Sequence, residues 1–145
     1  MTAFPELTKL VDKSDLSFTV GRKKYDVCPT AAAGLRAQAA IQNELAAGMP
    51  ASRQWEIAVD LMGGRYNTET GEITGGVAGD LIKAGASYAE LRRVVMTVFI
   101  HAWIGPEPAE QYYKDGVLDL GKVMESQTPT EETPKEETDP DAETD

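Results

Sequence analysis

The sequence predicts a helix-dominated α+β domain, in which an N-terminal β-hairpin packs on a small helical bundle and a disordered acidic tail follows. Three observations carry this prediction. Apolar residues alternate along residues 16–28, they recur at helical spacing along 87–104, and residues 125–145 contain no aromatic residue, valine, isoleucine or leucine. A chain of 145 residues suits one domain. We place that domain at residues 1–124.

Two short runs joined by a glycine-initiated loop indicate the hairpin, at about residues 16–28. The apolar positions of the two runs alternate with polar ones: Leu16, Phe18, Val20, Tyr25 and Val27. The loop begins at Gly21, and the basic run 22–24 falls on the expected turn, where charge discourages pairing with other strand edges. Pro29 ends the second run. Cys28 is expected to be buried at this strand end.

Two helices are predicted after the hairpin, over about residues 30–47 and 52–62. Thr30 and Ser52 are the expected N-caps, because a hydroxyl can accept a hydrogen bond from an orphan N–H of the first turn. Helical spacing places one expected face on each helix: Leu35, Gln38, Ile41 and Leu45 on the first, and Trp55, Ala58, Val59 and Met62 on the second.

Residues 63–85 are rich in turn formers and allow two interpretations. The first part, up to Gly76, is either an exposed loop or a small hairpin. Residues 77–85 are consistent with a short helix that ends at Gly85.

The strongest helix signal covers residues 87–104. Ser87 and Glu90 form a capping-box pattern, and Gly105-Pro106 ends the segment. The apolar residues between them form one continuous stripe: Leu91, Val94, Val95, Val98, Phe99, Ala102 and Trp103. We therefore expect the central core helix here. A further short helix over about 108–114 has Pro108 in its first turn, and its tyrosines can fold back on the bundle.

Catalytic and metal chemistry find little support in the sequence. His101 is the only histidine and Cys28 the only cysteine, so neither has a partner for a metal site, an internal disulfide or a catalytic pair. The loop at 67–72 lacks the spacing of a calcium-binding loop. The common phosphate-binding, hydrolase and zinc motifs are absent. We expect a protein that is not an enzyme and needs no cofactor.

Charge patterning argues against nucleic acid as a partner. Residues 125–145 hold nine acidic side chains and one lysine, a net charge of −8, while residues 1–124 carry a net charge of −2. The two basic clusters, at 22–24 and at Arg92-Arg93, are small, and the second is expected on the solvated side of its helix. Binding to a polyanion such as DNA or RNA requires several lysine and arginine side chains that converge on it. The tail is interpreted as a solvating segment or, alternatively, as a partner-binding one.

Nothing in the sequence suggests a membrane. Residues 1–15 lack the basic start and apolar run of a signal peptide, and the longest apolar stretch, 94–104, is too short to cross a bilayer. We expect a soluble, cytoplasmic protein.

The order of several short motifs resembles a known family. "AFPELTKL" precedes a hairpin of the form V-G-R-x-Y-x-V-x-P, followed by "GLRAQ", "LMGGRY", "SYAELRRVVMTVFIHAWIG" and "EPAEQYY", and an acidic end closes the chain. This pattern, over about residues 3–115, resembles the tail assembly chaperones of long-tailed (siphovirus-type) phages of actinobacteria.

The resemblance implies a function in virion assembly within the host cytoplasm. Such chaperones bind the tape measure protein, keep it soluble and help the tail tube protein polymerise around it. Many also occur in a longer form made by ribosomal frameshifting, and they are absent from the mature virion. A homo-oligomer is possible under this reading. The alternatives are a small structural virion protein, at the head–tail connection or the tail end, and a nucleic-acid-binding regulator.

A chaperone of this kind needs apolar surface for the helices of its cargo. The candidate partner-binding residues are the large apolar and aromatic side chains of the predicted helices, each of which can equally belong to the core: Trp55, Met62, Phe99, Trp103, Tyr112 and Tyr113.

Overall fold

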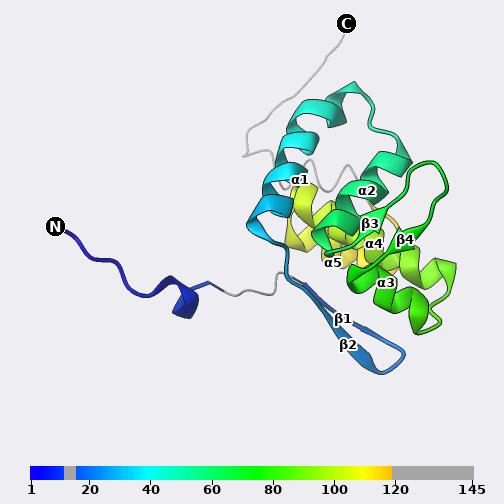
Figure 1. Ribbon diagram of the computed structural model, residues 1–145, viewed down its shortest axis with the longest axis horizontal. Coiled ribbons are helices and arrows are strands. Elements are labelled where there is room, and N and C mark those ends of the chain that lie inside the picture. Colours follow the sequence, from blue (N-terminus) through cyan, green and yellow to red (C-terminus); the bar gives the residue numbers. More distant parts are fainter. Residues whose placement is uncertain (12–15, 119–145) are drawn as a thin grey trace, which may run out of the picture.

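A computed structural model describes residues 1–11 and 16–118 (Figure 1). Helices hold 58% of the described residues, and the strands form two separate two-stranded antiparallel sheets. The predicted helix-dominated α+β fold with an N-terminal hairpin is therefore confirmed. The predicted tail at 125–145 and the predicted domain end at residue 124 lie outside the described residues. None of the described helices is long and apolar enough to span a membrane.

The N-terminal hairpin consists of β1 (Leu16–Val20) and β2 (Lys23–Val27). Phe18 lies opposite Tyr25, and both are buried together with Val27. The two-residue turn has positive φ angles at Gly21 (58°) and Arg22 (75°), as a type I′ turn requires. This turn matches the right-handed twist of the strands and keeps the basic residues exposed.

α1 (Ala31–Glu44) continues into the 3₁₀ turn η2 (Leu45–Ala47), and Pro50 precedes α2 (Ala51–Leu61). The Oγ1 atom of Thr30 accepts a hydrogen bond from the N–H of Ala33 (3.1 Å), which confirms this cap. The predicted cap at Ser52 is wrong, because α2 already begins at Ala51.

The predicted face of α1 is correct only in part. Ile41 and Leu45 are half-buried and pack against the core, but the fully buried side chains lie on another face. The buried residues are Ala33, Ala37 and Ala40, whereas Leu35 is 66% exposed. The small alanines allow α1 to pack closely against α2 and α4. Leu35 is two positions, or about 200°, from both Ala33 and Ala37, so it lies on the opposite side of the helix.

Of the two interpretations of residues 63–76, the small hairpin is correct. β3 (Arg65–Tyr66) pairs with β4 (Ile73–Thr74), and Asn67 Oδ1 accepts hydrogen bonds from the N–H groups of Glu69 and Thr70 in the loop between them. α3 (Gly76–Lys83) follows. The two ends of this segment meet where the backbones at Gly64 and Gly76 come into direct contact.

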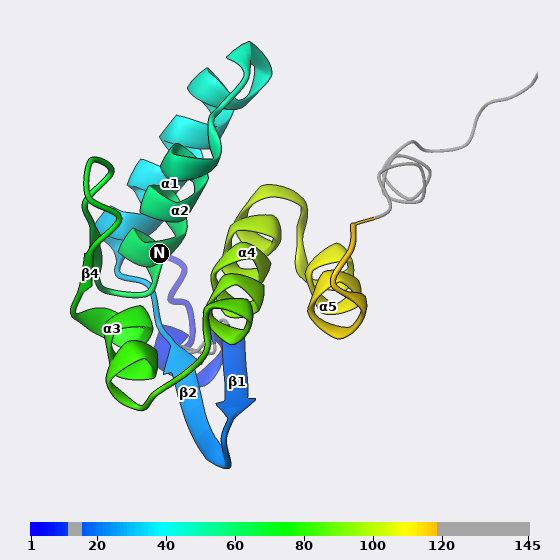
Figure 2. The same cartoon turned by 90° about the vertical axis from the view of Figure 1, so that its right-hand side faces the viewer.

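α4 (Tyr88–Ile104) occupies the middle of the molecule and contacts α1, α2, α3, β1 and α5 (Pro106–Asp115) (Figure 2). The capping box is confirmed: the N–H of Ser87 donates to Glu90 Oε1 (2.8 Å), and the N–H of Glu90 donates to Ser87 Oγ (3.1 Å). The buried stripe runs from Leu91 to Ile100. It does not include the predicted last turn, since Ala102 and Trp103 are exposed.

Two further interpretations need correction. Cys28 is exposed, because its side chain follows the buried Val27 in the strand alternation and points to the other side. Arg93 is half-buried between α4 and α5, whereas Arg92 is exposed as expected. The N–H of Arg93 Nη1 donates to the carbonyl oxygen of Tyr113 (2.9 Å), and its guanidinium lies over the ring of Tyr112 (5.9 Å to the centroid).

Candidate functional site

An apolar groove opens between α1, the end of α4 and the base of the N-terminal hairpin. It has a volume of about 430 Å³, within the range of about 300–1,000 Å³ that is usual for binding sites. We call it the apolar groove. Its apolar lining includes Leu16, Val27, Ala37, Ile41, Ala102 and Trp103.

The local sequence of two helices explains why the hollow exists. α1 faces it with Gly34, which has no Cβ atom, and with the small side chain of Ala37, and together they leave space that a leucine would fill. On the opposite side, the apolar stripe of α4 continues for one turn beyond the core. Trp103 is therefore 37% exposed, with its ring centroid 6.2 Å from that of the buried Phe99. The groove is an extension of the core that the described part of this chain does not cover.

Among the described residues, the lining of the groove contains no acidic side chain, lysine or arginine; its polar members are Gln38, Gln42 and His101. Leu35 extends the apolar surface at the rim, because it precedes Gln38 by three residues and Gln42 by seven, which places all three on one face of α1. A surface without lysine or arginine that is bordered by amide side chains suits the apolar face of a peptide or helix better than a phosphate.

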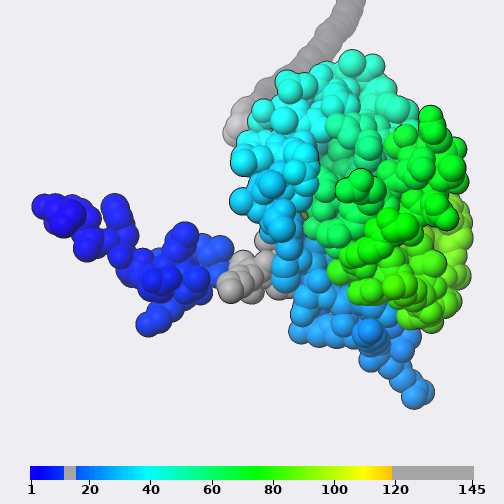
Figure 3. Space-filling view, viewed as in Figure 1, coloured from blue at the N-terminus to red at the C-terminus, as the bar shows by residue number. Residues whose placement is uncertain are grey.

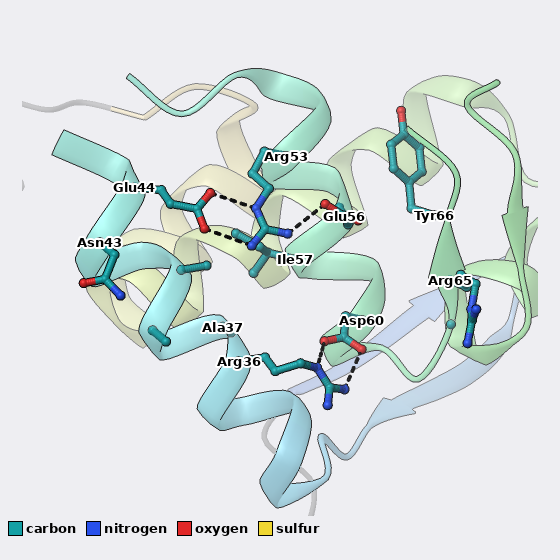
Figure 4. A pocket seen from close by; sticks show the side chains of 13 residues that line it. Arg36, Ala37, Asn43, Glu44, Arg53, Glu56, Ile57, Asp60, Arg65 and Tyr66 are labelled. Carbon is teal, nitrogen blue, oxygen red and sulfur yellow. Dashed lines mark hydrogen bonds and ion pairs between the residues drawn. The ribbon is translucent and has the colours of Figure 1, made fainter. Parts of the chain in front are cut away.

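A second hollow, of about 760 Å³, lies between α1 and α2 and differs in chemistry (Figure 4). Arg36 donates two hydrogen bonds to the Asp60 carboxylate (2.9 and 3.0 Å). Arg53 donates two to Glu44 (2.9 and 3.0 Å) and one to Glu56 (2.7 Å). These five charged side chains pair with one another and tie α1 to α2, so we interpret them as structural; Arg65 also lines the hollow but takes no part in these pairs.

The ion pair between Arg53 and Glu44 makes the stability of the fold depend on pH. Its hydrogen bond holds the pKa of Glu44 below the ordinary value, against the opposing effect of burial. A carboxylate with a depressed pKa stabilises the fold at neutral pH and loses this contribution as pH falls through that pKa. We expect the stability difference between wild type and Glu44→Gln, measured by urea unfolding, to shrink between pH 7 and about pH 3. An unchanged difference at the lower pH would contradict this assignment.

The six candidate residues lie in different environments. Met62, Phe99 and Tyr112 are buried in the core. Trp55 and Tyr113 are half-buried, the first beside the rings of Tyr66 and Tyr88 and the second beside Phe18 (5.3 Å between centroids). Among these six, Trp103 alone lines the apolar groove. The sequence reasoning missed Leu16, Gly34 and Ile41 as groove residues, although a glycine within an alanine-rich helix was a signal for a shallow surface.

Other site chemistry is not apparent in residues 1–11 and 16–118. They contain no group of three or more His, Cys, Asp or Glu side chains arranged to hold a metal ion. His101 lines the apolar groove and lies half-buried beside the core stripe of α4.

Fold and groove together define a small helix-dominated α+β domain with an open, uncharged apolar groove. The chain belongs to the family described as "Domain of unknown function (DUF7426)", whose model matches residues 5–144. A comparison with curated proteins finds no match, and neither does a comparison with solved structures.

Proposed function

We propose that this protein is a non-enzymatic tail assembly chaperone of a long-tailed actinobacterial phage. It binds the tape measure protein, keeps it soluble and promotes assembly of the tail tube around it. The observation that carries the proposal is the apolar groove, which is open, uncharged and bordered by an exposed tryptophan. The order of the sequence motifs supports the same family.

The groove is suited to a helical cargo. An amphipathic helix docks by placing side chains at i, i+3, i+4 and i+7 into an apolar depression. Ala37 and Ile41 would form the floor of this contact, and Trp103 its wall, since tryptophan is enriched among residues that dominate binding energy. The amides of Gln38 and Gln42 would face the polar edge of the cargo helix. The −8 charge of residues 125–145 would keep the complex soluble.

Co-expression with a helical segment of the tape measure protein from the same phage tests the proposal. We expect the wild-type chain to keep this segment soluble and to co-purify with it, and Trp103→Lys to abolish both effects. Ile82→Lys is the matched control, because Ile82 is 44% exposed and also lies in the last turn of its helix, but outside the groove. A segment that stays insoluble with the wild-type chain, or is rescued equally by Trp103→Lys, would refute the proposal.

Purified virions distinguish the chaperone from a small structural virion protein. We expect the chain in the cytoplasm of infected cells but not in mature particles, whereas a stoichiometric amount in particles would establish the structural role. DNA retention at physiological salt tests the regulator alternative. Binding that is lost when Arg22, Lys23 and Lys24 are changed to alanine would favour a nucleic-acid partner instead.

A further inference from the structure

Besides the terminal Met1, the first eleven residues, which we call the N-terminal arm, expose four large apolar side chains. Phe4 is 86% exposed, Leu7 and Leu10 are each 65% exposed, and Val11 is 56% exposed. The space-filling view shows the arm standing off the body of the molecule (Figure 3). A segment that exposes this much apolar surface is typical of a surface with a partner.

The arm already has one helical turn, which includes Leu7. The 3₁₀ turn η1 (Leu7–Lys9) leads into Leu10, whose backbone is also helical. The carbonyl oxygen of Leu7 accepts hydrogen bonds from the N–H groups of both Leu10 (2.9 Å) and Val11 (3.0 Å). Phe4, Leu7 and Val11 are separated by three and four residues, so continuing this turn in both directions would align them on one face.

The apolar groove has the complementary properties. It is uncharged, and its volume of about 430 Å³ is large enough for several apolar side chains. The groove also lies next to the root of the arm: Leu16 lines it, and only four residues separate Leu16 from Val11. Each copy of the chain thus carries an apolar insert and an apolar receptor side by side, and residues 1–11 and 16–118 of that copy do not bring the two together.

We propose that the apolar groove of one copy receives the N-terminal arm of a second copy, in a reciprocal exchange that makes a two-fold symmetric dimer. The position of Leu16 favours this occupant. Because each arm leaves its own body at the edge of its own groove, an arm entering that groove passes beside the arm that leaves it. A two-fold axis between them generates both contacts at once, and formation of the first makes the second effectively intramolecular.

This inference concerns the chain by itself and does not rest on the identity of the cargo. If the groove also binds a helical cargo, the arm and the cargo compete for one site. The dimer is then the resting form, in which the apolar groove and the four apolar side chains of the arm are covered.

Sedimentation equilibrium of the purified full chain tests the dimer over about two decades of protein concentration. We expect the mass to rise from that of one chain to that of two. Deletion of residues 1–11, Leu7→Lys in the arm and Trp103→Lys in the groove should each leave a single chain, and Ile82→Lys should behave as wild type. Circular dichroism verifies that each variant is folded. This is expected because no residue of the arm is buried and because Trp103 and Ile82 are 37% and 44% exposed.

Mixing the two single-site variants gives the sharpest result. Leu7→Lys retains an intact groove and Trp103→Lys retains an intact arm, so their mixture can form one of the two contacts. We expect a heterodimer, weaker than the wild-type dimer, from two variants that are each monomeric alone. A full chain that remains monomeric, a dimer that survives removal of the arm, or a mixture that stays monomeric would each overturn the proposal.

Discussion

Gly76→Ala is expected to destabilise the protein by about 2–5 kcal/mol, the sum of a left-handed backbone (~1–2 kcal/mol) and an overpacked contact (~1–3 kcal/mol). Gly76 has φ of +66°. A Cβ atom there would lie 2.6 Å from both the carbonyl carbon of Gly63 and the carbonyl oxygen of Met62, and closer still to the amide nitrogen of Gly64. All three atoms belong to the backbone, so no side-chain rotation can relieve the overlap.

The contact matters because it closes the segment between α2 and α3. The N–H of Val77 donates to the carbonyl oxygen of Met62 (3.0 Å), which joins the end of α2 to the start of α3. Met62 and Leu81 are both in the core. Moving the two backbones apart would therefore displace buried side chains as well as break a hydrogen bond.

Gly85→Ala is the matched control. Gly85 also has a positive φ (+89°), but a Cβ atom there meets nothing within 4 Å. The stability lost in Gly85→Ala should come from the left-handed backbone conformation alone, about 1–2 kcal/mol. Urea unfolding of both variants measures the difference. Equal losses would show that the backbone contact at Gly76 costs nothing and would contradict our explanation.

Local patterns in the sequence predicted the elements that depend on local chemistry. Alternation placed the N-terminal hairpin, and the Ser87–Glu90 spacing placed the start of α4, because both signals arise from residues near each other in the chain. The glycine pairs at 63–64 and 75–76 were recognised only as turn formers. Their direct backbone contact joins residues twelve apart, and no local rule distinguishes that contact from two independent turns.

The candidate site was predicted only in part, and for a physical reason. Trp103 follows from the apolar stripe of α4, since that stripe is longer than the surface its neighbours cover. Leu16 and Ile41 belong to the groove only because the hairpin and α1 lie beside the end of α4, which is a property of the tertiary fold. The wrong assignment of Leu35 has the same origin: helical spacing finds an apolar face, but packing with neighbouring helices selected the alanines.

The adjacent arginines of α4 show how differently two neighbouring residues can be used. Arg92 is exposed, whereas the side chain of Arg93 reaches α5 through the carbonyl oxygen of Tyr113 and the ring of Tyr112. A Cβ atom at Gly116, which ends α5 with φ of +79°, would lie 2.9 Å from the guanidinium carbon of Arg93. The absence of a side chain at Gly116 therefore makes room for the guanidinium.

Arg93→Ala is expected to cost about 2–4 kcal/mol, from a hydrogen bond to a charged donor (~1.5–3 kcal/mol) and a cation–π contact (~0.5–1 kcal/mol). Arg92→Ala removes the same charge from the exposed neighbour and should stay within about 0.5 kcal/mol of wild type. Urea unfolding measures both losses, and amide hydrogen exchange should show that Arg93→Ala lowers protection in α5 more than in α1. Equal losses, or protection lowered evenly over both helices, would mean that Arg93 does not fasten α5 to α4.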